Sequence, residues 1–162
     1  MSAIAKLNKM HALGVYAPAA FQAIKSLLED AKEGGAFTTV CGHRDSFLSY
    51  TVFVGSPSPG KLDKYRWLSQ EKILRTMHRG DVSSFLSNDK DKEQYPGGVW
   101  IIPWGYGTSG FKSLDDEAFS IAMGVKAGDI SMPTAEALAR LSSNEDRVQR
   151  FLYAMKDLPF RG

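Results

Sequence analysis

Residues 97–110, with the sequence GGVWIIPWGYGTSG, decide how the rest of the chain is interpreted. Val99–Ile102 is a short run of large apolar residues, which is typical of a buried strand. Gly105–Gly110 then places glycine at three of six positions, and this composition predicts a loop. Ser113 follows with the pattern of a helix start. We therefore expect a strand, a glycine-rich loop and a helix, in this order, at the centre of the fold.

Two segments before this stretch have the composition of β-strands. Ala36–Cys41 and Ser46–Val54 are rich in Thr, Val, Phe and Tyr, and the second alternates between two faces. The residues between them, 42–45, are few enough to close an antiparallel hairpin. We predict an α+β fold in which these segments and Val99–Ile102 form a small, mainly antiparallel sheet.

Helical periodicity surrounds the expected strands. Apolar residues recur at three- and four-residue steps, and glycines follow several of these segments as stop signals. The helices should cover one face of the sheet, and the C-terminal part should be helical. The expected helices span residues 2–13, 18–33, 69–80 with Ser69 as a candidate cap, 113–124, 133–141 and 144–156.

The bulk composition predicts an ordinary globular protein. A chain of 162 residues with 43% apolar residues is long enough to bury one core, so we expect a single domain over 1–162. The net charge of +2 gives no general attraction to nucleic acid. Cys41 is the only cysteine, which excludes an intramolecular disulfide and fits a reducing compartment. With no apolar run of about 20 residues and no signal-peptide pattern, we expect a soluble, cytoplasmic protein without membrane contact.

The glycine-rich segment is the first candidate site. Its G-x-G-x-x-G pattern lets backbone N–H groups approach a phosphate, and the helix that follows favours negative charge. Hydroxyl groups, one lysine and an aromatic ring for stacking complete the set. The candidate ligand-binding residues are Trp104, Gly105, Tyr106, Gly107, Thr108, Ser109 and Lys112.

Two other interpretations of the glycine pattern stay open. A dinucleotide-binding fold would start its helix within the motif and would need further strands after Gly110, but the remaining chain reads as helical. The plainer alternative is a glycine-rich turn that lets Trp104 and Tyr106 pack.

A basic stretch over residues 61–79 is the second candidate site. Six cations oppose two carboxylates here, and aromatic residues lie among them. Such a surface suits an acidic protein partner or, with weaker support, single-stranded nucleic acid. The alternative is a solvated helix face with Trp67 and Leu68 packed in the core. The candidate partner-binding residues are Lys64, Arg66, Trp67, Arg75 and Arg79.

Two smaller clusters have weaker functional patterns. Cys41, His43 and Asp45 would share one face of an extended strand, but a turn would scatter them and no further metal ligand accompanies them. The acidic run 115–117 follows Ser113 in a pattern that resembles a capping box, and the helix dipole also favours carboxylates there. We interpret this run as capping rather than catalysis.

Two functions follow from these patterns. The preferred one is a non-catalytic binding protein that uses the basic and aromatic surface against a macromolecule. The alternative is a binding protein or enzyme that takes a phosphorylated small molecule or nucleotide at Gly105–Gly110. No catalytic residue, metal site or cofactor is assigned, and exposed aromatic residues leave homo-oligomer contacts open.

Overall fold

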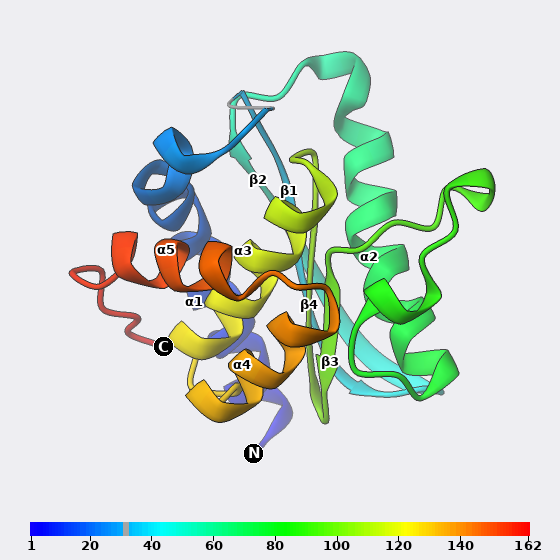
Figure 1. The fold of residues 1–162 in the computed structure, drawn as a ribbon. Coiled ribbons are helices and arrows are strands. Elements are labelled where there is room, and N and C mark those ends of the chain that lie inside the picture. The colour runs from blue at the N-terminus through cyan, green and yellow to red at the C-terminus, as the bar shows by residue number, and fades with distance from the viewer. Residues whose placement is uncertain (31–32) are drawn as a thin grey trace.

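The structure, a computed structural model, describes residues 1–30 and 33–162. Its antiparallel sheet has the strand order β2-β1-β4-β3 (Figure 1). The predicted α+β class with a helical C-terminal part is confirmed. Helices lie on both faces of the sheet, whereas the sequence suggested one covered face: α2 packs on one side, and α1 and α3 pack on the other.

The elements follow each other along the chain with short connections. The strands are β1 (Gly34–His43), β2 (Ser46–Gly55), β3 (Gly98–Ile101) and β4 (Trp104–Ser109). The helices are α1 (Ala3–Ile24), α2 (Leu62–Arg79), α3 (Ser113–Lys126), α4 (Met132–Leu141) and α5 (Glu145–Ala154). Short 3₁₀ turns cover Lys25–Leu27, Pro59–Lys61, Ser84–Ser87 and Lys90–Lys92.

The predicted hairpin of β1 and β2 is confirmed. His43 pairs with Ser46, so the turn is two residues long. The predicted alternation of β2 is also present, because Tyr50 contacts α1 while Thr51 bonds through Thr38 toward α2.

The predicted loop at Gly105–Gly110 is wrong, because residues 104–109 form β4 between β1 and β3. The chain reverses earlier, at residues 102–103, where Ile101 pairs with Trp104. The glycines serve the packing of α2. A Cβ on Gly107 would lie 2.1 Å from the Ser69 carbonyl oxygen, and one on Gly105 would lie 2.4 Å from Ile73 Cγ2. Glycine is therefore what lets a helix backbone approach this strand so closely.

The N-terminal part forms one helix instead of two. α1 runs through Gly14 and Pro18 and ends at Ile24, before the end of the helix expected over 18–33; residues 31 and 32 of that prediction lie outside the described part. Gly14 is a packing position, since a Cβ there would lie 2.4 Å from Tyr50 Cε1.

The α2 helix begins at Leu62, seven residues before the expected cap at Ser69. Ser69 lies buried inside the helix and bonds to Thr38 of β1 at 2.7 Å. The predicted end at Gly80 is confirmed, with φ of 71° in the left-handed region.

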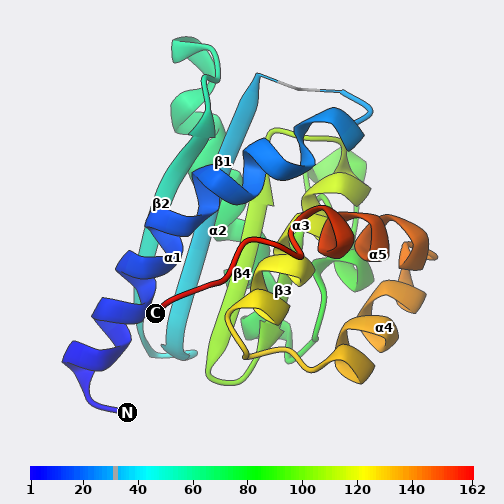
Figure 2. The same cartoon turned by 90° about the vertical axis from the view of Figure 1, so that its left-hand side faces the viewer.

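Figure 2 shows α1 and α3 across the face of the sheet opposite α2, with α4 and α5 packed on α3. Aromatic rings fill this layer; Phe37 meets Phe119 edge to face at 6.0 Å between ring centroids. Among the described residues, none of the helices combines the length and the apolar character that crossing a bilayer requires.

Candidate functional site

A buried ion pair joins three elements of the fold. Lys72 of α2 places Nζ 2.9 Å from Asp116 Oδ2 of α3, and the two side chains are only 2% and 4% exposed. The same Nζ donates to the Thr108 carbonyl oxygen of β4 at 2.7 Å. Asp116 Oδ1 accepts from the Phe111 N–H at 3.0 Å. Charges removed from water this completely need such partners, so the pair fixes α2, β4 and α3 relative to one another.

Burial changes the acidity of Asp116. Loss of solvation raises the pKa of its carboxyl to about 7, although the Lys72 ammonium and the Phe111 N–H both oppose the change. Near neutral pH the carboxyl is therefore partly protonated, and positive charge dominates the pair.

A cavity of about 280 Å³ opens next to this pair, and we call it the junction cavity. It lies where α2 meets the β4–α3 connection. Its wall includes Lys72 and Asp116 together with Lys64, Tyr65, Tyr95, Ser109, Gly110 and Ser113. A second recess of about 500 Å³ shares Tyr65, Gly110 and Phe111 with it and adds two carboxylates and two lysines, Asp30, Glu33, Lys61 and Lys112.

The start of α3 faces the junction cavity. Lys112 is the N-cap, in extended conformation, and no side chain caps the helix among the residues that the structure describes. The predicted capping box is therefore wrong: Ser113 is already helical and Asp116 is buried against Lys72. The N–H groups of a helix's first turn lack partners within the helix and carry partial positive charge.

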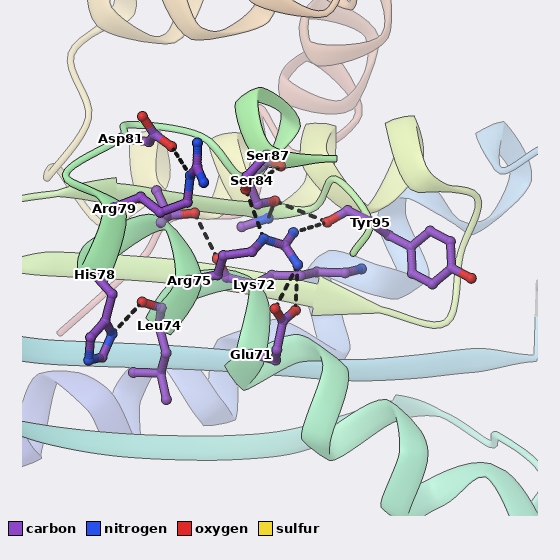
Figure 3. A network of polar contacts seen from close by, with 12 residues as sticks. Glu71, Lys72, Leu74, Arg75, His78, Arg79, Asp81, Ser84, Ser87 and Tyr95 are labelled. Atoms are coloured by element: carbon purple, nitrogen blue, oxygen red, sulfur yellow. Dashed lines mark hydrogen bonds and ion pairs between the residues drawn. The ribbon is translucent and has the colours of Figure 1, made fainter. Parts of the chain in front are cut away.

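Arg75 holds the chain segment that carries Tyr95. Its guanidinium donates to both Glu71 carboxylate oxygens at 2.6 and 2.8 Å, to Ser87 Oγ at 2.8 Å and to the Tyr95 carbonyl oxygen at 2.7 Å. Figure 3 shows this network, with the Tyr95 ring turned away from it. The ring instead lines the junction cavity. Arg75 thus positions one wall of the cavity.

The neighbouring carboxylates, Asp115 and Glu117, are both fully buried. Asp115 accepts from the Glu29 N–H at 3.2 Å and pairs with Arg147 Nε at 2.8 Å. Glu117 accepts from Ser83 and Asn144. Burial raises the pKa of both carboxyl groups. One feature of the sequence could have predicted the burial of these carboxylates: residues 118–124 carry no charge, which indicates a helix buried on all sides.

The structure separates the predicted ligand-binding residues into two groups. Ser109 lines the junction cavity and Lys112 lines the adjoining recess. The other five residues, 104–108, are buried within β4. Ligand binding by these residues stays a prediction. Residues 104–109 lie in a strand, not in the predicted loop.

The predicted partner-binding residues also separate. Lys64, Arg66 and Trp67 are exposed, and the Trp67 side chain is 57% exposed. The alternative that Trp67 packs in the core is therefore wrong. Arg75 is directed inward with its side chain 8% exposed, and Arg79 pairs with Asp81 at 2.9 Å.

The Cys41 cluster does not form a metal site. Cys41 is buried, and burial raises the pKa of its thiol, while His43 and Asp45 are exposed at the hairpin end. Within residues 1–30 and 33–162, no group of three or more His, Cys, Asp or Glu side chains is arranged to hold a metal ion.

No protein-family model, curated protein or solved structure matches this chain. Its function is therefore inferred from the geometry of its own residues.

Proposed function

We propose that the chain binds a small phosphorylated molecule in the junction cavity. The observation that carries this proposal is that two sequence-predicted sites border one cavity. Lys64 comes from the basic stretch, and Ser109 comes from the end of the glycine-rich segment. This moves the predicted ligand from the glycines of β4 to the β4–α3 connection.

The charge of the cavity favours an anion. Two ammonium groups, of Lys64 and Lys72, line it against one carboxylate, that of Asp116. Because the pKa of Asp116 is raised to about 7, protonation makes the cavity more positive near neutral pH. Lys64 also pairs with Glu93, but at 3.5 Å and with both side chains 59% exposed, so an anion can compete for its ammonium.

Other groups suit the two ends of such a ligand. The Ser113 hydroxyl and the first-turn N–H groups of α3 are hydrogen-bond donors for phosphate oxygens. The Tyr65 and Tyr95 rings offer apolar surface for a flat group. The cavity volume lies near the lower limit of about 300 Å³ for small-molecule sites, which suits a monophosphate with one ring.

Thermal unfolding tests the proposal with inorganic phosphate, a nucleoside monophosphate and a sugar phosphate as probes. A ligand at about 100 times its Kd stabilises the native state by about 2.7 kcal/mol. For a chain of this size, that corresponds to an increase in Tm of about 5–10 °C. No change in Tm with any of these probes at millimolar concentration would contradict the proposal.

Charge reversal identifies the site. Lys64→Glu should remove the increase in Tm that the ligand causes, because it replaces a cavity cation with an anion. Lys90→Glu is the matched control, since Lys90 is exposed on the segment before β3 and does not line the cavity. Equal responses of the two variants would place the ligand elsewhere.

Binding of a macromolecule stays the second proposal, and exposed Trp67 favours it. Trp67 borders a groove of about 300 Å³ with Leu74 and His78 on the outer side of α2. Arg66 lies beside it, over the Phe53 ring at 5.3 Å. If this surface recruits an acidic protein, Trp67→Ala and Arg66→Glu should both abolish a complex recovered from lysate. Arg79→Glu should not, because Arg79 lies at the other end of α2. Unchanged recovery by the first two variants would contradict this function.

A further inference from the structure

β2 is an edge strand without the usual protection. Within the described part of the chain, β2 pairs only with β1, in ten consecutive residue pairs without a bulge. Residues 46–55 contain no charged residue and no proline. Sheet edges in monomeric proteins are normally protected by lysine, proline, bulges or a covering segment, because an open edge is a template for another strand.

The opposite edge shows the contrast. β3 has four residues, and the preceding segment covers it. Ser83 forms a β-bridge with Val99, and the Trp100 N–H donates to the Val82 carbonyl oxygen at 3.0 Å. One edge of the sheet is therefore short and covered, while the other is long and pairs with no further strand in the described part of the chain.

The helix beside β2 has an outer side that is unusual for a surface helix. Residues 10–24 of α1 contain no charged residue, although Val15 in this run is 67% exposed. Ile4 and Leu7, about three and two turns before it on the same side, are 72% and 52% exposed. A helix that faces water normally carries charged or polar residues there. We call the exposed side chains of Ile4, Leu7, His11 and Val15 the α1 flank.

The α1 flank and the β2 edge are adjacent. The His11 and Tyr50 rings meet edge to face with 6.4 Å between centroids, and Gly14 lies against Tyr50. Leu48 and Tyr50 add exposed apolar surface on the same side, at 37% and 39% exposure. The exposed side of α1 over residues 4–15 and the strand β2 therefore form one uncharged surface at this border of the molecule, and further along α1 runs obliquely away from β2 across the sheet (Figure 2).

We propose that this surface binds a second copy of the chain, with β2 pairing antiparallel to β2 of the partner. The two-fold axis of such a pair is perpendicular to the sheet, so it keeps both α1 helices on the same face. The two α1 flanks then meet beside the joined strands. An unrelated extended peptide could pair with β2 but would leave the flank exposed. The absence of charge on β2 also means that self-pairing opposes no like charges.

This surface is large enough for a weak dimer. A strand of ten residues is about 33 Å long. The α1 flank over residues 4–15 is about 16 Å long and about 10 Å wide, and β2 adds one strand spacing of about 5 Å along its whole length. Together these give about 330 Å² per copy, or about 660 Å² in total, which is the size of a weak interface.

Sedimentation at equilibrium tests the proposal on the full chain. We expect the wild type at twice 17.8 kDa and the double variant Leu7→Glu/Val15→Glu at 17.8 kDa. The matched control, Leu141→Glu/Tyr153→Glu, places two glutamates on exposed apolar positions of α4 and α5 and should stay dimeric. Circular dichroism confirms that each variant is folded. A monomeric wild type at 100 µM, or a flank variant that stays dimeric, would overturn the proposal.

Cysteine cross-linking tests the strand pairing itself. The only native cysteine, Cys41, is buried, so an added cysteine reports on its own position. Ser46→Cys, Ser49→Cys and Thr51→Cys place thiols along β2, and only positions near the two-fold axis should form disulfide-linked dimers. Ser143→Cys, on an exposed turn, is the control. Cross-linking only at residue 143 would contradict pairing through β2.

Discussion

The two faces of the sheet are packed by opposite means. On the side of α2, Gly105 and Gly107 of β4 have no side chains, and the helix backbone rests close to the strand. On the other side, Tyr106 of the same strand is fully buried and stacks with Phe37 at 6.3 Å between ring centroids. Glycine and aromatic residues thus alternate along β4, because successive side chains point to opposite faces. The glycine pattern is explained by packing, without any ligand.

Both faces contain buried polar contacts, since Thr108 of β4 bonds to Ser120 of α3 at 2.8 Å on the aromatic side, but the ion pair with the least exposed side chains in the described part of the chain involves α2. The aromatic layer stabilises by apolar burial, which is tolerant of small changes in shape. The α2 side contains the Thr38–Ser69 hydrogen bond and the Lys72–Asp116 ion pair, both buried. Removing either member of a buried ion pair strongly lowers the stability of the fold. We therefore expect the α2 face to be the more sensitive to single substitutions, and the junction cavity lies at its border.

The largest expected effect follows from removing one member of the ion pair. Lys72→Met keeps the length of the side chain but leaves the buried Asp116 carboxyl without its ammonium, so the carboxyl must either stay charged without a cationic partner or take up a proton as its pKa rises further. At pH 8 this should lower the free energy of unfolding by about 3–5 kcal/mol, measured by urea denaturation.

The double variant Lys72→Met/Asp116→Leu is the control for this prediction. It also removes the Asp116 carboxyl that lacks a cationic partner, so it should recover more than half of the unfolding free energy lost in Lys72→Met. A double variant as unstable as the single one would show that the packing of Lys72, rather than its charge, is what matters.

The next effect tests the close approach of α2. Gly107→Ala adds one methyl group 2.1 Å from a backbone oxygen of the helix, which cannot rotate away. We expect a loss of about 3 kcal/mol, at the upper end of the usual cost of overpacking. Gly60→Ala is the matched control, because a Cβ there has no neighbour within 4 Å, and it should change stability by less than about 0.5 kcal/mol. Similar losses in both variants would refute the packing explanation.

The sequence was sufficient to predict the hairpin and the fold class. In β1 and β2 the composition and the alternation agree with the final structure, since local preference and burial point the same way. The error at β4 arose because glycine favours loops locally, whereas here a helix 30 to 40 residues earlier in the chain requires it. A contact of this kind leaves no periodic signal.

The candidate site was predictable only in part. Lys64 and Ser109 were each identified, but nothing in the sequence shows that they border one cavity. Arg75 could not be distinguished from exposed Arg66, because both carry the same charge on the same helix. Their difference depends on Ser87 and Tyr95, which the chain brings back against one side of α2.

The third prediction concerns pH. The pKa of Asp116 is raised from 3.8 to about 7 in the folded state, so between these values the folded chain binds a proton that the unfolded chain has released. Its contribution to stability therefore decreases as pH rises from about 4 to 7.

Asp116→Asn isolates this contribution, since Asp115 and Glu117, whose pKa values are also raised, remain in the variant. The unfolding free energy of the wild type minus that of the variant, measured by urea denaturation, should fall steadily as pH rises from about 4 to 7. Parallel pH curves would contradict the prediction.

The smallest expected effect is on the aromatic face. Phe119→Leu replaces the ring between Phe37 and Phe111 with a smaller apolar side chain that still fills most of the space, so it should cost only about 1 kcal/mol. Urea denaturation of this variant beside Gly107→Ala compares the two faces directly, since both sites are buried next to β4 or β1. If Phe119→Leu costs less stability than Gly107→Ala, then the stability of the α2 face depends on the distance between helix and strand more than on the amount of apolar surface buried. The reverse order would mean that the two faces are held by the same forces and that the glycines of β4 need another explanation.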